Sequence, residues 1–216
     1  MPGGAFAHLN LGVSYLKRGR YEEAVEALKV AIRFKPDDAE VYVHLGKAYG
    51  GLDRNQEAVE AYKAAMRLKP DYAEAMYNLG LAYGLLGQYE EAHATCREAA
   101  RLEPEDAEAH AILGIASLGL GRHEEAVATF REAIRLKPDH VRGHYGLGVA
   151  VLGLGRHEEA VAALNEALHL KPDHAEAHYF LGLAYARLGN REAARKEHAI
   201  LEELNHDMAK KLLPQI

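Results

Sequence analysis

The side chains that could do chemistry in this 216-residue sequence are its 13 histidines, its two serines and its single cysteine. His140 and His144 are four residues apart, as are His174 and His178, so each pair could share one helix face and hold a divalent cation. The first member of each pair falls at a predicted helix start, and a third ligand would have to come from another segment. The sequence therefore favours capping and packing over adventitious Zn²⁺ or Ni²⁺ binding, and it predicts no functional metal site or cofactor.

The serines and the cysteine do not suggest nucleophilic catalysis. Ser14 and Ser117 lie inside predicted helices, and Cys96 occupies a position at which bulky core side chains recur. No Ser-His-Asp or Cys-His order is visible, and neighbouring acids such as Glu124 and Glu125 point to different faces of a helix. We therefore expect that the protein is not an enzyme.

A glycine-containing string, LGLGRHEEAVA, occurs twice, from Leu118 to Ala128 and from Leu152 to Ala162. Glycines ahead of a basic residue can bind phosphate, but such loops require G-x-G-x-x-G after a strand or the Walker pattern ending in Gly-Lys-Ser/Thr. The sequence contains neither pattern and predicts no strand. The two copies start 34 residues apart, which indicates a structural repeat whose glycines end one helix before the next begins.

Several series of residues keep this 34-residue step along the chain. The closing prolines are Pro36, Pro70, Pro104, Pro138 and Pro172. The Leu-Gly pairs begin at Leu11, Leu45, Leu79, Leu113, Leu147 and Leu181. Six units therefore fill residues 5–206 and leave no room for a separate domain.

Each unit is predicted to be a helical hairpin. An aspartate three residues before a glutamate, as in Asp37 and Glu40, resembles a capping box, and Asp71 and Asp173 repeat the pattern. The second helix begins with acidic residues and ends with basic ones, which complements the helix dipole. In the sixth unit a short amphipathic helix over residues 207–213 is predicted to cover the end of the array.

This period and these residue types resemble the tetratricopeptide repeat (TPR) family over nearly the whole chain. The tyrosine series Tyr15, Tyr49, Tyr83 and Tyr185 matches the family, as do the Leu-Gly pairs, small residues and prolines. Departures are Ser117 and Val151 at the tyrosine position, and Cys96 and His198 at a bulky position. The position of the family's tryptophan holds His8, Tyr42, Met76, His110, His144 and His178.

The resemblance implies an all-α fold, a right-handed α-α superhelix of antiparallel helical hairpins. Residues 1–216 would form a single TPR solenoid. Its repeats would span residues 5–38, 39–72, 73–106, 107–140, 141–174 and 175–206, followed by the capping helix at 207–213.

In TPR folds the first helices line a concave groove, so the resemblance implies which side chains face a partner. This groove would consist of Leu9, Val13, Val43, Lys47, Tyr77, Asn78, Leu81, Ile115, Leu118, Tyr145, Val149, Tyr179 and Leu183. The carboxylate clamp of co-chaperone members is absent from these positions. Of the asparagine ladder of glycosyltransferase-associated members, only Asn10 and Asn78 remain. The remaining side chains are mostly apolar, which suits an amphipathic helix.

Composition and charge narrow the function classes. Apolar residues make up 49% and charged residues 27%, the balance of a folded, soluble protein. The net charge of −6 argues against nucleic acid or anionic membranes as partners. No apolar run approaches the roughly 18 residues that span a membrane, and the first residues lack the features of a signal peptide. With a single cysteine, we expect a cytoplasmic protein.

The expected function is a non-enzymatic scaffold that binds an apolar or amphipathic peptide or helix of a partner protein in its concave groove. Two alternatives stay open. The first unit has no capping helix, so copies could stack into a homo-oligomeric structural scaffold, or the chain could be an accessory TPR domain excised from a larger enzyme. A histidine-rich surface that senses pH is a separate possibility.

Overall fold

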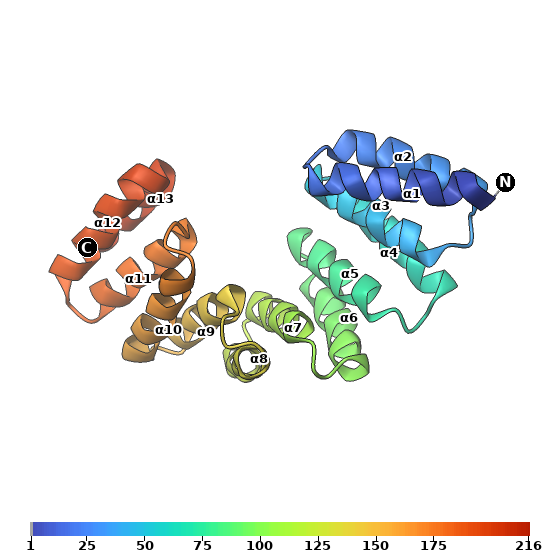
Figure 1. Cartoon of the computed structure of the whole chain (residues 1–216). Coiled ribbons are helices and arrows are strands. Elements are labelled where there is room, and N and C mark those ends of the chain that lie inside the picture. Colours follow the sequence, from blue (N-terminus) through green and yellow to red (C-terminus); the bar gives the residue numbers. More distant parts are fainter. Residues whose placement is uncertain (1) are drawn as a thin grey trace. The chain divides into compact units, whose positions relative to one another are not determined.

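The structure, a computed structural model, describes residues 2–216 and the side chains from Gly4 onward. The described residues form 13 α-helices and one short 3-10 helix, with no strand among them. Their contacts divide the chain into two compact units, Met1–Pro104 and Glu105–Ile216 (Figure 1). Both units are built from successive helical hairpins, which confirms the predicted all-α fold.

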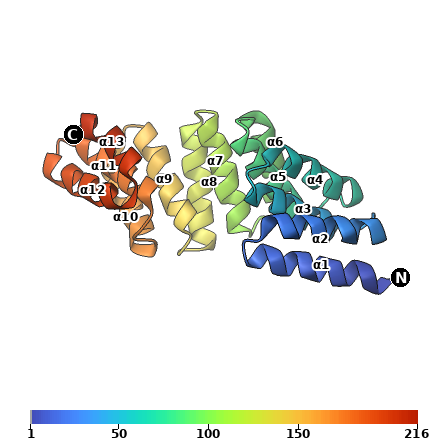
Figure 2. The ribbon, with the colours of Figure 1, turned by 90° about the horizontal axis from the view of Figure 1, so that it is seen from above.

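Unit 1 contains three helical hairpins. They are α1 (Pro2–Lys17) with α2 (Tyr21–Phe34), α3 (Ala39–Gly51) with α4 (Asn55–Leu68), and α5 (Ala73–Leu85) with α6 (Tyr89–Leu102). The two helices of each hairpin lie side by side (Figures 1 and 2). In addition, α2 packs on α3 and α4 packs on α5, so the second helix of one repeat covers the first helix of the next.

Unit 2 contains three more hairpins and a cap. The hairpins are α7 (Ala107–Gly119) with α8 (His123–Leu136), α9 (Val141–Gly153) with α10 (His157–Leu170), and α11 (Ala175–Arg187) with α12 (Arg191–Leu204). Helix α13 (His206–Leu212) and the 3-10 helix η1 (Leu213–Gln215) follow. As in unit 1, α8 packs on α9 and α10 packs on α11.

Close helix crossings explain why glycine recurs inside the first helices. A Cβ atom on Gly46 would lie 2.4 Å from the ring of Tyr62, far inside van der Waals contact. In unit 2 the ring of Phe130 is fully buried between two glycines, and a Cβ atom would lie 2.8 Å from it at Gly114 and 2.3 Å at Gly146. A larger residue would force the helices apart, and close-packed interiors tolerate such strain poorly.

The repeated string LGLGRHEEAVA forms the turn between two helices of a hairpin. Gly121 and Gly155 adopt φ angles of 71° and 75°, a left-handed conformation that side chains disfavour. Each glycine follows the end of a first helix, α7 or α9, and precedes the start of the second. The prediction of a structural repeat is therefore confirmed.

The terminal helix α13 supplies a side chain that the last repeat lacks. In the other repeats the Leu-Gly glycine contacts a side chain of its own second helix, as Gly148 contacts Leu164. At Gly182 the nearest atoms belong instead to Leu212 of α13, while His198 of α12 is half-buried. His198 therefore does not fill the bulky position predicted for it, and α13 completes the core as the predicted cap.

Helix capping differs from the prediction by one residue. The structure places Asp38 rather than Asp37 before α3, and His174 rather than Asp173 before α11, and neither side chain caps its helix. Two first helices do have a side-chain cap: Asp106 accepts a hydrogen bond from the Glu108 amide, and His140 accepts one from the Gly143 amide. The capping box was therefore a wrong interpretation of the Asp-x-x-Glu spacing.

At three of the six positions of the family's tryptophan, a polar side chain hydrogen-bonds a proline carbonyl in the turn before its helix. The hydroxyl of Tyr42 donates to the carbonyl of Pro36 over 3.1 Å. Nε2 of His144 lies 2.8 Å from the carbonyl of Pro138, and Nε2 of His178 lies 2.9 Å from that of Pro172. These side chains satisfy carbonyls in the turns between repeats, so the histidines act in packing and capping as predicted.

Candidate interaction site

The predicted groove residues fall in both units, and each set is described within its own unit. In unit 2 they come from α7, α9 and α11, at every third or fourth residue of each helix. All six are half-buried: Ile115, Leu118, Tyr145, Val149, Tyr179 and Leu183. All of them except Val149 pack against the hydrophobic clusters of unit 2. We call this set the unit 2 first-helix face. It presents apolar and aromatic side chains that retain some exposed surface.

In unit 1 the predicted residues divide into two groups. Val13, Tyr77 and Leu81 are half-buried, like their counterparts in unit 2. Val43 is only 1% exposed and Leu9 only 8%, and both belong to the hydrophobic core. Their placement on the groove surface is corrected here, because α1, α3 and α5 contact one another and enclose these short side chains.

The two polar residues predicted for the unit 1 groove already have partners. Nζ of Lys47 lies 2.5 Å from Oε1 of Glu74, an ion pair between α3 and α5. Nδ2 of Asn78 donates to the carbonyl of Glu74, one helical turn earlier, over 2.7 Å. Each side chain therefore already makes one hydrogen bond within unit 1, and the charge of Lys47 is paired with that of Glu74.

An aromatic cluster lies on the unit 2 first-helix face. The ring of Tyr145 stacks on His174, with centroids 4.8 Å apart, and lies 6.0 Å from Phe180. Tyr179 meets Phe180 edge-on at 5.3 Å. Burial, assisted by the negative charge of Glu176, raises the pKa of Tyr145 to about 12. Its hydroxyl therefore stays protonated at neutral pH and remains a hydrogen-bond donor.

Charged side chains beside this face were missed at the sequence level. In unit 2 they are Glu108, Arg142 and Glu176, at the second position of α7, α9 and α11. Oε2 of Glu108 lies 3.0 Å from Nε2 of His140, and its Oε1 contacts the guanidinium of Arg142. The recurrence is visible in the sequence, but the sequence does not show that Glu108 pairs with Arg142.

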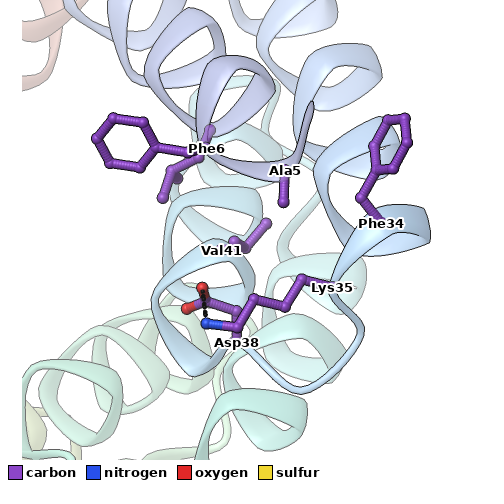
Figure 3. A pocket seen from close by; sticks show the side chains of 7 residues that line it. Ala5, Phe6, Phe34, Lys35, Asp38 and Val41 are labelled. Atoms are coloured by element: carbon purple, nitrogen blue, oxygen red, sulfur yellow. Dashed lines mark hydrogen bonds and ion pairs between the residues drawn. The ribbon is translucent and has the colours of Figure 1, made fainter. Parts of the chain in front are cut away.

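An apolar pocket opens at the N-terminal end of unit 1. Figure 3 shows the rings of Phe6 and Phe34 on opposite sides of it, with Val41 between them and the Lys35–Asp38 ion pair below. The pocket has a volume of about 510 Å³, and Ala5 and Leu9 complete its lining. Phe6 is 68% exposed and Phe34 52% exposed. Lys35 and Asp38 are joined over 2.9 Å, so the pocket's charges are neutralised.

A second pocket lies at the equivalent place in unit 2, with a volume of about 520 Å³. It occurs three repeats later, so Glu108 corresponds to Phe6, Leu136 to Phe34 and His140 to Asp38. The residues that line it are Glu105, Asp106, Ala107, Glu108, Leu136, Lys137 and His140. This pocket is polar, and Glu108 and His140 in its lining bind each other.

The groups that could do chemistry are held in structural contacts. Cys96 is completely buried, and burial raises the pKa of its thiol to about 12, so it is not a nucleophile at neutral pH. The hydroxyl of Ser117, also buried, donates to the carbonyl of Leu113 over 3.0 Å. Within the described residues, no group of three or more His, Cys, Asp or Glu side chains is placed to hold a metal ion.

The succession of hairpins agrees with known proteins. Residues 3–211 match the family described as the cilia and flagella-associated protein 70 C-terminal domain, a TPR family. The chain belongs to this TPR family. No curated protein is detectably similar to this TPR chain in sequence. Among the residues that the structure describes, no helix is both long and apolar enough to cross a bilayer.

Solved structures show the same fold. MamA, residues 41 to the end, from Desulfovibrio magneticus RS-1 is 26% identical with a TM-score of 0.69, over 79% of this TPR chain and 97% of that one. PilW, a type IV pilus biogenesis factor, is 21% identical with a TM-score of 0.86, over 97% and 98%. YrrB, described as a TPR protein with an unusual peptide-binding site, is 24% identical with a TM-score of 0.63, over 87% and 97%.

Proposed function

We propose that this TPR protein is a non-enzymatic scaffold and that its first-helix faces bind an apolar or amphipathic segment of a partner protein. The observation that carries the proposal is the unit 2 first-helix face, where Tyr145, Val149 and Leu183 are half-buried beside an aromatic cluster. Aromatic side chains in partly buried settings supply much of the energy of protein interfaces. The peptide-binding site named for YrrB, a protein of the same fold, is consistent with this role.

Charge beside the face favours an amphipathic partner over a purely apolar one. Glu108 and Arg142 form an ion pair at the second position of α7 and α9, and Glu176 lies near His174. These groups offer hydrogen bonds at the edge of the apolar face. A helix with apolar residues toward Val149 and polar residues toward this edge would satisfy both surfaces.

The experiment is crosslinking from the proposed face in cells. A photo-reactive phenylalanine analogue at Tyr145 should give a crosslinked partner, while the same analogue at exposed His169 on α10 should not. Val149→Glu should reduce the crosslinked product about tenfold or more, since a carboxylate would then face an apolar segment. Ala162→Glu, on the exposed face of α10, is the matched control. Equal crosslinking from both positions, or no loss with Val149→Glu, would refute the proposal.

A further inference from the structure

One face of α1 lacks the cover that its counterparts have in later repeats. Leu11 is 44% exposed, but at the same repeat position Leu45, Leu79 and Leu181 are 7%, 3% and 1% exposed, and Leu147 is half-buried. The neighbouring residue on this face, Ala7, is also exposed, while Val41 at its position in α3 is 2% exposed. We call Ala7, Leu11 and Ser14 the α1 face.

The structure shows what covers this face in the other repeats. The second helix of the preceding repeat packs there, as α2 does on α3, α4 on α5, α8 on α9 and α10 on α11. Tyr21 at the start of α2, for example, lies where a Cβ atom on Gly51 of α3 would be 2.5 Å away. The α1 face therefore continues an established interface between repeats, and its natural cover is an amphipathic helix of the second-helix type.

A groove with acidic residues at its edge borders the α1 face at Leu11. The groove has a volume of about 410 Å³ and lies between α1 and α2. Its apolar lining comes from Leu11, Tyr15, Ala27 and Val30, and its acidic lining from Glu22, Glu23 and Glu26. The same groove recurs one repeat later, around Leu45 and Tyr49, with Glu57 and Glu60 at its edge. An acidic edge around an apolar lining favours a helix that carries basic residues.

The position of Glu23 has a partner from the preceding repeat at one place in unit 2. In unit 2, Arg131 of α8 reaches Glu159 of α10 over 2.6 Å, although Glu159 also pairs with Arg156 of its own repeat. Glu23 holds the repeat position of Glu159 and pairs only locally, with Arg20 at 2.5 Å, among the ion pairs of the described residues. The position of Arg131 is basic in each of the first four repeats, as Lys29, Lys63, Arg97 and Arg131.

We propose that the α1 face binds an amphipathic helix of a partner protein, which packs on α1 as the second helix of one repeat packs on the first helix of the next. The apolar side of this helix packs on Leu11, and a lysine or arginine on it pairs with Glu23. A second copy of this chain fits less well. Its last second helix, α12, has Ala199 where the basic residue is needed, and α12 is already covered by α13 through Leu201 and Leu212.

The probe for this site is a synthetic peptide with the sequence of α8, His123–Leu136, with blocked ends and a fluorescent label. It contains the apolar side and the arginine, Arg131, that the proposal requires. Fluorescence anisotropy should show saturable binding to the intact protein. Leu11→Asp should weaken binding about tenfold or more, because it places a charge under the apolar side of the helix. Leu81→Glu, at a half-buried predicted groove residue of α5, should leave it unchanged, which separates this site from the proposed function.

A charge exchange tests the predicted ion pair. Glu23→Arg should weaken binding of the α8 peptide, and the peptide with Arg131→Glu should bind this variant better than it binds the wild type. Glu57→Arg is the matched control, because α2 already covers that repeat and binding should not change.

Two results would overturn the assignment. The first is a wild-type protein that binds the peptide no better than Leu11→Asp does, including no saturable binding at all. The second is a wild-type dimer, seen by sedimentation, that Leu11→Asp dissociates, since the occupant would then be another copy of this chain.

Discussion

The N-terminal pocket of unit 1 and its equivalent in unit 2 have nearly the same volume, about 510 and 520 Å³, but opposite chemistry. Phe6 and Phe34 line the first with exposed rings, while Glu108 and His140 in the second bind each other. The helical hairpins place both pockets at the same point of the repeat. The repeat architecture therefore determines where a pocket forms, and two or three side chains determine what it can bind.

The largest effect on stability is expected from replacing a buried phenylalanine of unit 2, compared with an exposed phenylalanine of unit 1. Phe130 of unit 2 is completely buried between Gly114 and Gly146, so Phe130→Ala should lower the free energy of unfolding by about 3–5 kcal/mol through the cavity it leaves. Phe34→Ala removes a ring that is already 52% exposed and should cost less than about 1 kcal/mol. Urea denaturation of both variants measures the difference. Similar losses would mean that the N-terminal pocket is a packed core rather than an open surface.

The polar pocket of unit 2 can be converted to the apolar type by one substitution. Glu108→Phe introduces the residue that unit 1 carries at this position. His140 would lose the acceptor of its Nε2–H group, and Arg142 its ion pair, so the free energy of unfolding should fall by about 1–2 kcal/mol. Glu108→Gln, which keeps an acceptor, should cost less. An unfolding free energy equal to the wild type in Glu108→Phe would show that these contacts do not stabilise unit 2.

The same pocket should make stability depend on pH. Nδ1 of His140 accepts the Gly143 amide, so the proton of the neutral ring lies on Nε2 and points to Glu108. Burial, and then the positive charge of Lys137, lower the pKa of His140 below its usual 6.5. A lowered pKa means that the folded state favours the neutral ring. Its contribution is therefore complete above pH 6.5 and decreases as the pH falls from 6.5 to the lowered pKa.

Denaturation at several pH values checks this dependence. The free energy of unfolding of the wild type should fall as the pH is lowered from 7.5 to below about 6.5, the usual histidine pKa. His140→Gln should reduce this fall. His206→Gln is the control, because His206 is exposed at the start of α13 and should leave the dependence unchanged. An identical pH dependence in the wild type and His140→Gln would contradict the assignment.

The hairpins and their order could be predicted from the sequence because the 34-residue period reflects packing that every repeat shares. The terminal cap could be predicted because a short amphipathic segment follows the last repeat. What differs between repeats could not. The fifth position of the first helix is half-buried at Tyr145 but enclosed at Val43, since a long side chain reaches beyond the neighbouring helices and a short one does not. The ion pair between Glu108 and Arg142 depends on how two first helices lie against each other. The 34-residue period does not specify how two neighbouring first helices lie against each other.

The smallest change is expected from the reverse substitution, Phe6→Glu, which gives unit 1 the residue of the polar pocket. The ring of Phe6 is 68% exposed, so little apolar burial is lost, and the free energy of unfolding should stay within about 0.5 kcal/mol of the wild type. Binding of an environment-sensitive hydrophobic dye should nevertheless fall, because one of the two rings beside the pocket is gone. Asn10→Glu adds the same charge to exposed α1 and should leave dye binding unchanged. If Phe6→Glu instead lowers the free energy of unfolding as much as Glu108→Phe does, the ring of Phe6 packs into its pocket in solution. Both pockets would then be filled by their own side chains, and they would differ only in which side chains fill them.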